Sequence, residues 1–278
     1  MKRWLIASIL FLLPSCIAFP LVRIFGGEGY SFGRKSRIGF SLILTSGIYL
    51  GEGAVIQSGN LILTKSIHLG TRSRIQRMNL LKGRFRVQLD AEAVINKYNR
   101  ILSASSNLRE SELILGINAI IGVSHFIDMT ASVRLGANSI LAGIGSQLWT
   151  HGFYHSRSGA ARWRVDGSIS IGQNVYVGSR VLICSDVCIC DAVTVGAGAV
   201  VAKSLTEPGL YVGQALRYKE FDPDQAICHY AKVADRMVRK YAPFRCFISL
   251  FKAVLPTIHY YILYRTSILD CCFRQKEV

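Results

Sequence analysis

Residues 169–204 read as six consecutive hexads, ISIGQN, VYVGSR, VLICSD, VCICDA, VTVGAG and AVVAKS. The first and the third residue of every hexad are aliphatic, so two apolar registers recur every six residues. An α-helix repeats its apolar positions every three or four residues, and neither register has that period. Repetition of a short unit indicates a solenoid, in which similar units stack on one another.

The hexads predict a chain that forms a short strand, turns a corner and repeats. Three hexads would complete a triangular coil of 18 residues, with the aliphatic side chains stacked inside and the backbone paired with adjacent coils. Glycine, asparagine, aspartate and serine are expected at the corners. The alternative is a parallel sheet with helical crossovers, but each crossover needs about a dozen or more residues. The connections here are shorter, so we predict a mainly β protein built as a parallel β-helix.

The same period continues upstream with shifts. Three further series have members six residues apart: Leu44, Leu50, Ile56 and Ile62; Leu69, Ile75, Leu81 and Val87; and Leu115, Ile121, Ile127 and Val133. We therefore expect a β-helix domain over residues 36–220, preceded by a hydrophobic and basic segment over residues 1–35 and followed by a basic amphipathic tail over residues 221–278. Residues 96–111 could be an irregular coil or a loop.

Composition limits the possible partners. The chain has 278 residues, half of them hydrophobic, which excludes a wholly disordered protein, and its net charge of +16 predicts an anionic partner. Nucleic acid, an acidic membrane surface and a polyphosphate cofactor all fit that charge, but no nucleic-acid-binding motif is present, so we expect no nucleic acid partner. The eight cysteines form no CxxC pair, which is typical of reduced thiols in a cytosolic protein.

Residues 147–214 carry a more specific pattern. The segment opens with QLWTHG and proceeds through IGQNVYVGS, VTVGAGAVVAKS and EPGLYVGQ, and upstream stands HFIDMTASVRLGANSILAG. This series resembles the hexapeptide-repeat acyltransferases, particularly the polysaccharide O-acetyltransferase branch. The resemblance implies a left-handed β-helix, a homotrimer, acetyl-CoA as cosubstrate without a metal, and a sugar or lipid-linked oligosaccharide acceptor. One departure is the GQAL at residues 213–216, where family members usually have Gly-Asn-Pro-Ala.

Transfer of an acetyl group from a thioester to a hydroxyl requires a base, and histidine suits this role because its unperturbed pKa is about 6.5. The resemblance assigns the base to His151, in the Thr-His pair. His155 is the alternative base, or a substrate-binding residue, and a structural role for both histidines is the third possibility. His125 and Asp128 are expected on one coil face, where they would bind substrate or serve the structure.

Further site residues follow from the loop at residues 150–167 and from the resemblance. Arg162 and Trp163 suit a sugar substrate carrying phosphate, since guanidinium groups bind phosphate and indole stacks on sugar faces; a solvated loop is the alternative. By resemblance, the pantetheine arm lies in a groove between subunits and contacts the backbone amides of two corner residues. The cofactor-binding residues would be Gly178, Ser179, Gly196, Ala197, Lys203 and Arg217, with amide contacts at Gly178 and Ala197.

Two other classes of function remain open. Related β-helices with three histidines bind zinc and act as lyases, and His68 and His125 fall inside the repeats. No complete ligand set stands at matching repeat positions, so we expect no metal. A noncatalytic scaffold that binds sugars or partners is the other alternative.

Both ends of the chain suggest a membrane surface. Residues 4–22 are uncharged, which is long enough for a membrane span or a signal peptide, although Pro14 and Pro20 weaken a straight helix. Because acetyl-CoA is cytosolic, we expect an uncleaved hydrophobic anchor and a cytoplasmic protein associated with the inner membrane. The tail places cations among aromatic residues, as an interfacial helix requires, or it packs on the solenoid as a cap.

Overall fold

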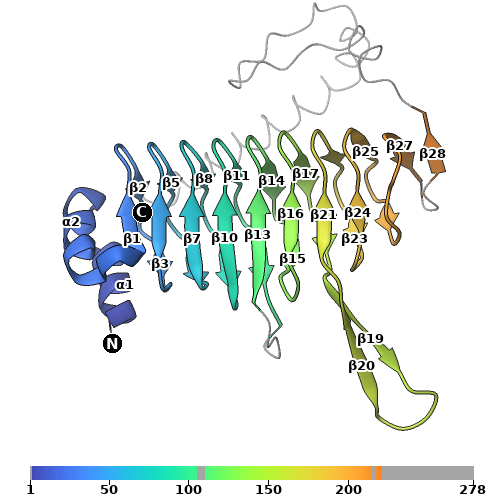
Figure 1. The fold of residues 1–278 in the computed structure, drawn as a ribbon, viewed down its shortest axis with the longest axis horizontal. Helices are drawn as coiled ribbons and strands as arrows, with labels where there is room; N and C mark the ends of the chain where they lie inside the picture. Colours follow the sequence, from blue (N-terminus) through green and yellow to red (C-terminus); the bar gives the residue numbers. More distant parts are fainter. Residues whose placement is uncertain (1, 105–109, 214–216, 221–278) are drawn as a thin grey trace, which may run out of the picture. The chain divides into compact units, whose positions relative to one another are not determined.

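The computed structural model describes residues 2–104, 110–213 and 217–220. They form a three-sided prism of parallel strands, preceded by two helices (Figure 1). The helices are α1 (Lys2–Leu12) and α2 (Ser15–Gly26), and the 3-10 helix η1 (Gly27–Gly29) leads into the first strand. The amphipathic tail predicted for residues 221–278 lies outside the described residues.

The strands line three faces of the prism. Face A contains β1 (Tyr30–Phe32), β4 (Ile48–Leu50), β7 (Ser66–Leu69), β10 (Phe85–Leu89), β13 (Ser111–Leu115), β16 (Val133–Leu135), β21 (Ile169–Ile171) and β24 (Cys188–Ile189). Face B contains β2 (Arg37–Ile38), β5 (Val55–Ile56), β8 (Arg74–Ile75), β11 (Val94–Ile95), β14 (Ile120–Val123), β17 (Ile140–Ile144), β22 (Tyr176–Val177), β25 (Val193–Val195), β27 (Gly209–Val212) and β28 (Arg217–Lys219). Face C contains β3 (Leu42–Ile43), β6 (Leu61–Leu63), β9 (Leu80–Lys82), β12 (Arg100–Leu102), β15 (Phe126–Asp128), β18 (Gln147–Leu148), β23 (Leu182–Ile183) and β26 (Val200–Val201).

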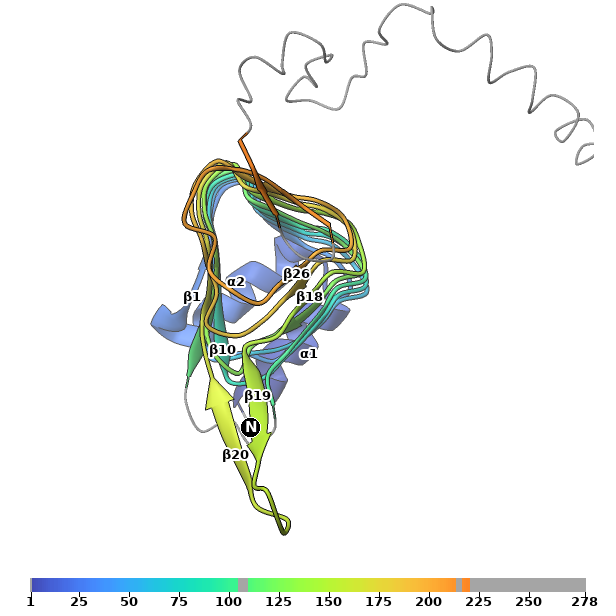
Figure 2. The same cartoon turned by 90° about the vertical axis from the view of Figure 1, so that its right-hand side faces the viewer.

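The coil is left-handed and its interior is apolar. Figure 2 looks along the prism from the end of the last coils, and successive faces run clockwise as the chain approaches the viewer. Both apolar registers of the six hexads point inward, as predicted, and none of these side chains is more than 2% exposed. Their stacking removes apolar surface from water on every coil, which is the main stabilising contribution of such a fold.

The period of six fails in the first coil. Ile43 is 1% exposed and faces inward, whereas Leu44 is half-buried and faces outward. Neighbouring residues of a strand point to opposite faces, so only one of the two can enter the core. The prediction that Leu44 belongs to the inward register was therefore wrong.

Coil length also varies. Ser170 pairs with Cys188, which gives the predicted 18 residues for the hexads, but upstream Ile67 pairs with Val87 after 20 residues. The two additional residues lie between faces C and A: Ile183 and Val187 are four positions apart in the hexads, whereas Leu81 and Val87, which occupy the equivalent places upstream, are six apart. At the other two corners Arg72, Met78, Glu92 and Tyr98 have positive φ, besides the glycines and asparagines expected. Within residues 96–111, β12 is regular, and residues 105–109 lie outside the described part.

The N-terminal segment is two helices. Pro14 is the N-cap residue of α2, and it separates α1 from α2 because proline has no backbone N–H to continue the first helix. Ile6, Leu10 and Val22 are buried, and α1 contacts β3 and α2 contacts β1, so the helices cover the open end of the first coil. In residues 2–104, 110–213 and 217–220 no helix combines the length and the apolar character needed to cross a bilayer. The described solenoid begins at Tyr30, upstream of the predicted residue 36.

Candidate active site

The residues of the candidate site meet at one edge of the prism, where each coil passes from face C to face A. We call this edge CA. Asp128 is the last residue of β15, and the next coil follows β18 with Trp149, Thr150 and His151. Because Phe126 pairs with Gln147 and Ile127 pairs with Leu148, Asp128 and the Thr-His pair come side by side on adjacent coils.

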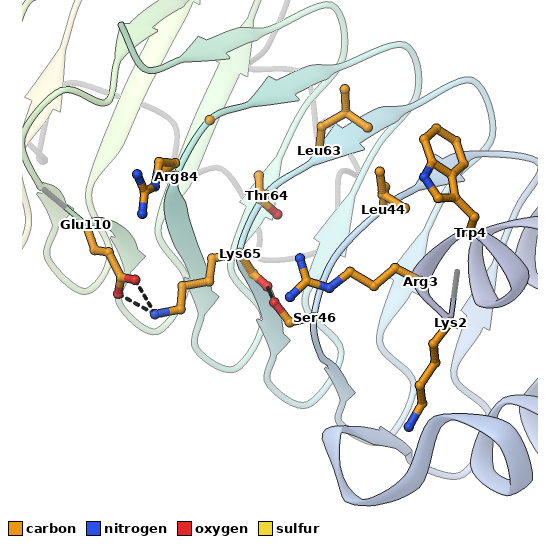
Figure 3. Close-up of a pocket in the computed structure, with 11 residues that line it drawn as sticks. Lys2, Arg3, Trp4, Leu44, Ser46, Leu63, Thr64, Lys65, Arg84 and Glu110 are labelled. Atoms are coloured by element: carbon orange, nitrogen blue, oxygen red, sulfur yellow. Dashed lines mark hydrogen bonds and ion pairs between the residues drawn. The ribbon is translucent and has the colours of Figure 1, made fainter. Parts of the chain in front are cut away.

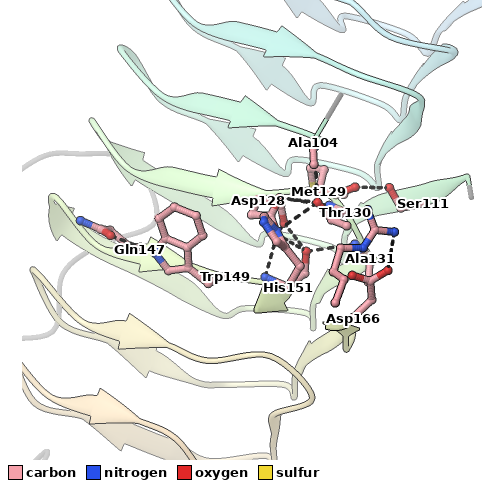
Figure 4. A network of polar contacts seen from close by, with 12 residues as sticks. Ala104, Ser111, Asp128, Met129, Thr130, Ala131, Gln147, Trp149, His151 and Asp166 are labelled. Atoms are coloured by element: carbon pink, nitrogen blue, oxygen red, sulfur yellow. Dashed lines mark hydrogen bonds and ion pairs between the residues drawn. The ribbon is translucent and has the colours of Figure 1, made fainter. Parts of the chain in front are cut away.

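Asp128 is the centre of a hydrogen-bond network (Figure 4). Its Oδ1 accepts a bond from the Thr130 hydroxyl at 2.7 Å. Its Oδ2 accepts bonds from the Thr150 backbone N–H at 3.0 Å, the Thr150 hydroxyl at 2.6 Å and the His151 ring at Nδ1 at 2.7 Å. The residue is 2% exposed, and a buried carboxylate of this kind is tolerated only because its oxygens are hydrogen-bonded.

The network fixes the proton arrangement on His151. An ionised carboxylate only accepts hydrogen bonds, so Nδ1 of His151 carries the proton toward Asp128 and Nε2 of the neutral ring keeps a free lone pair. The His151 side chain is 18% exposed, which leaves one side of the ring accessible. This is the arrangement that a general base requires: an oriented imidazole with one accepting nitrogen.

Aromatic rings flank the imidazole. The indole of Trp149 lies edge-on to His151 with ring centroids 6.1 Å apart, and the ring of Phe153 lies edge-on at 5.8 Å. Phe126 packs against Trp149 at 4.8 Å, and the Trp149 indole N–H donates to Gln147 at 2.9 Å. Trp149 and Phe153 are partly exposed, so they offer aromatic surface next to the imidazole, and exposed aromatic rings can stack on sugar faces.

The polar loop predicted at residues 150–167 is a β-hairpin of β19 (His151–His155) and β20 (Arg162–Asp166) that projects from edge CA (Figure 1). Every second residue of a strand points to the same face, so Phe153 and His155 share the face of His151. Arg162 pairs directly with His155 and therefore lies on that face too. Trp163 pairs with Tyr154 and lies on the opposite face, with 67% of its surface exposed. The register therefore separates the predicted substrate residue Trp163 from the imidazole and places Phe153 there instead.

His125 has a structural position. It is 1% exposed, its backbone N–H donates to the Asn99 side chain at 2.8 Å, and its Nδ1 accepts the Ser146 backbone N–H at 3.0 Å. Asn60, Asn79 and Asn99 occupy the same place on earlier coils and are joined in the same way. Burial lowers the pKa of His125 to about 4, so the ring is neutral. A substrate on the surface does not reach this ring, and we leave His125 out of the site.

Four of the six predicted cofactor residues lie on another edge. Gly178, Ser179, Gly196 and Ala197 lie together on edge BC, where two adjacent coils pass from face B to face C. The Gly178 N–H donates to the carbonyl of Val195 at 2.9 Å, so the expected amide contact with a cofactor is wrong at this residue. A Cβ at Gly178 would lie 2.7 Å from the backbone nitrogen of Ala197, which shows that coil packing requires this glycine.

Ala197 and Lys203 remain suitable for ligand contacts. Ala197 is exposed, and within the described part of the chain its backbone N–H donates to no protein acceptor. Lys203 is exposed and lies on edge CA of the last hexad. Arg217 belongs by its backbone to β28, which runs antiparallel to β27, and the structure does not describe the side chain of Arg217. Among the described residues, no group of three His, Cys, Asp or Glu side chains is placed to hold a metal ion.

No family model matches this chain, and no curated protein matches it. Three solved structures to which it is similar are acetyltransferases. They are the polysialic-acid-specific acetyltransferase NeuO (15% identity, 69% of this chain and 80% of that chain, TM-score 0.43), the polysialic acid O-acetyltransferase OatWY (17%, 79% and 94%, 0.42) and a maltose O-acetyltransferase from Clostridium difficile 630 (16%, 78% and 83%, 0.35). These identities and TM-scores are too low to transfer the chemistry of those proteins to this chain.

Proposed function

We propose that this protein is an O-acetyltransferase that moves an acetyl group from acetyl-CoA to a sugar hydroxyl in the biosynthesis of a surface polysaccharide. The observation that carries the proposal is the His151–Asp128 pair, held at 2.7 Å on an accessible edge beside partly exposed aromatic rings. The sugar ring would stack on Trp149 or Phe153, which directs one hydroxyl toward Nε2 of His151.

The residues of the chain supply the acid–base part of the reaction. Nε2 of His151 accepts the hydroxyl proton as the sugar oxygen bonds to the acetyl carbon, and Asp128 stabilises the imidazolium that forms. The C–S bond then breaks, and the imidazolium returns the proton to the thiolate leaving group. Acetyl-CoA, when bound, supplies the activated acetyl carbon.

The placement of Gly178, Ser179, Gly196 and Ala197 favours a site shared between copies. Within one chain, His151 is on edge CA, whereas Gly178, Ser179, Gly196 and Ala197 are on edge BC, at a different corner of the prism. A thioester bound at edge BC of one copy meets an imidazole only if edge CA of another copy lies against it. We propose a homotrimer, which closes such contacts on itself, located in the cytoplasm at the inner membrane.

The test is transfer of radiolabel from acetyl-CoA by the full-length protein. Acceptors would be a panel of extracted lipid-linked oligosaccharides and soluble sugars, with calorimetric binding of CoA measured in parallel. The proposal expects CoA binding and labelled sugar ester. CoA binding without any labelled product over the panel would overturn the assigned reaction, and absence of CoA binding would favour a noncatalytic scaffold.

A further inference from the structure

A cavity lies on edge CA at the other end of the prism from His151 (Figure 3). It has a volume of about 750 Å³ and is formed between the first turn of α1 and the corners of the first coils. The residues that line it are Lys2, Arg3, Trp4, Leu44, Ser46, Leu63, Thr64, Lys65, Gly83, Arg84 and Glu110. None of them belongs to the site around His151.

The cavity has an excess of positive charge. Lys65 forms an ion pair with Glu110, which also receives Arg86 at 3.1 Å. Lys2, Arg3 and Arg84 have no carboxylate within ion-pair distance in the part of the chain that the structure describes. The N-terminal end of α1 adds the partial positive charge of its backbone amides. A site with this balance attracts an anion.

One buried hydroxyl in the wall lacks a partner. Thr64 is 6% exposed, and no hydrogen bond to its Oγ1 is found among the described residues. Figure 3 shows this side chain on the cavity wall between Arg3 and Lys65. A buried polar atom is unfavourable when unpaired, so an acceptor entering the cavity gains a hydrogen bond that the protein alone does not make.

The remaining wall is apolar. Leu44 and Leu63 are half-buried on the outer side of face C, and the indole of Trp4 is 60% exposed at the rim. Elsewhere on α1 and α2 further large apolar side chains are exposed, namely Leu5, Leu12, Ile17, Ile24 and Phe25. Cations beside apolar side chains suit a ligand with an anionic group and a hydrocarbon part.

The cavity and the His151 site occupy the same edge of the prism. Figures 1 and 2 both place the start of α1 and the β19–β20 hairpin along this edge. Two strand steps separate β9 from β15 and five separate β3 from β18, which corresponds to about 10 Å and about 24 Å along the edge at ~4.8 Å per step. An extended chain of sugars can span this interval.

We propose that the cavity binds the phosphate end of an anionic amphiphile, with its apolar part against Trp4, Leu44 and Leu63. Resting on the proposed function, we infer further that the acceptor is a sugar chain joined to that phosphate, which extends along edge CA to His151. Arg3 and Arg84 hold the phosphate, and Thr64 donates its hydroxyl proton to a phosphate oxygen.

Binding can be measured without activity. Calorimetry would compare dihexanoylphosphatidic acid, below its micelle concentration, with inorganic phosphate on the full-length protein and on the Arg3→Gln/Arg84→Gln variant. The matched control is Arg37→Gln/Arg74→Gln, which removes the same charge from exposed positions of face B. We expect the amphiphile to bind at least tenfold more tightly than inorganic phosphate, and the cavity variant to lose at least tenfold in affinity while the control changes less than twofold.

If both double variants lose the same affinity for the amphiphile, the effect is one of overall charge, and the cavity is not the binding site. Equal affinity for phosphate and amphiphile would overturn the role of the apolar wall. Thr64→Val, which preserves the shape of the side chain, should weaken binding about threefold, and no change would contradict the assigned hydrogen bond. In transfer assays the cavity variant should raise KM for a lipid-phosphate-linked acceptor and leave transfer to a soluble sugar unchanged; if no transfer occurs at all, the binding result still decides this proposal.

Discussion

The Nδ1 atom of His151 lies 2.7 Å from Oδ2 of Asp128, although 23 residues separate them in the chain. The contact exists because β15 and β18 are neighbours on face C, so that the end of one coil lies against the end of the next. The orientation of the imidazole therefore depends on the register of two coils.

Asp128→Asn should lower kcat for acetyl transfer by about 10²-fold or more, because an amide can donate to Nδ1 and so stabilise the wrong tautomer of His151. KM for the sugar should change little, since Asp128 is buried. Steady-state kinetics on purified protein tests this. Asp191→Asn makes the same chemical change on another edge, where the side chain accepts the backbone N–H of Gln173, and should keep normal activity. Equal kcat values for Asp128→Asn and wild type would refute the orienting role.

His125 should make stability depend on pH. The folded protein lowers the pKa of this ring from 6.5 to about 4, so the unfolded chain binds a proton between these values while the folded chain does not. As the pH falls from 6.5 to 4, the free energy of unfolding should therefore decrease by about 3 kcal/mol. Above pH 6.5 the ring is neutral in both states, and this loss is absent. Urea unfolding at several pH values measures it.

His125→Asn should keep the fold and remove this pH dependence, because Asn60, Asn79 and Asn99 already occupy the equivalent position on earlier coils. His68→Asn is the control: this exposed ring stacks on Tyr49, and its replacement should leave the acid dependence intact. If His125→Asn loses as much stability between pH 6.5 and pH 4 as the wild type does, another group causes the pH dependence.

Truncation of Trp149, which lies beside His151, and of Trp163, which lies on the hairpin, should have different effects. Trp149→Ala should raise KM for the sugar acceptor by about fivefold, since this ring lies beside the imidazole and sugar stacking is worth on the order of 1 kcal/mol. Trp163→Ala removes a more exposed indole from the face of the hairpin opposite to His151 and should change KM less than twofold. If Trp163→Ala has the larger effect, the acceptor binds the other face of the hairpin.

A shared site predicts complementation between inactive copies. His151→Ala removes the base on edge CA, and Ala197→Trp fills the proposed thioester slot on edge BC, so each homomeric variant should be inactive. Co-expressed and purified mixed oligomers should regain part of the activity, because some seams then contain an intact His151 and an intact Ala197. Activity that stays at the level of the separate variants would place the whole site within one chain.

The hexads alone predicted the core of the prism well, because inward positions at a period of six need only local spacing. Ile171, Val177 and Ile183 are buried as expected. Leu44 was assigned wrongly because the first coil reaches its inward residue one position earlier, at Ile43, and a corner can absorb such a shift without any mark in the sequence.

The site was less predictable because it forms between coils. The sequence predicted His151 as the base and Asp128 as a substrate-binding or structural residue beside His125. Hydrogen bonding between His151 and Asp128 depends on how many residues each coil contains, so it was not predicted. The alternation of His151, Phe153 and His155 could have indicated a strand and assigned the aromatic role to Phe153 rather than Trp163. Nothing in the hexad pattern revealed that the Gly178 N–H is already bonded to Val195.

The most direct test of the central claim is the rate of acetyl transfer by His151→Ala, measured with radiolabelled acetyl-CoA and an accepted sugar, beside His155→Ala and His68→Ala. Loss of a general base should lower kcat/KM by about 10²- to 10⁴-fold in His151→Ala, while CoA binding and the melting temperature stay near wild type and the other two variants retain at least half of the activity. Full activity in His151→Ala, or a comparable loss in His155→Ala alone, would contradict the account.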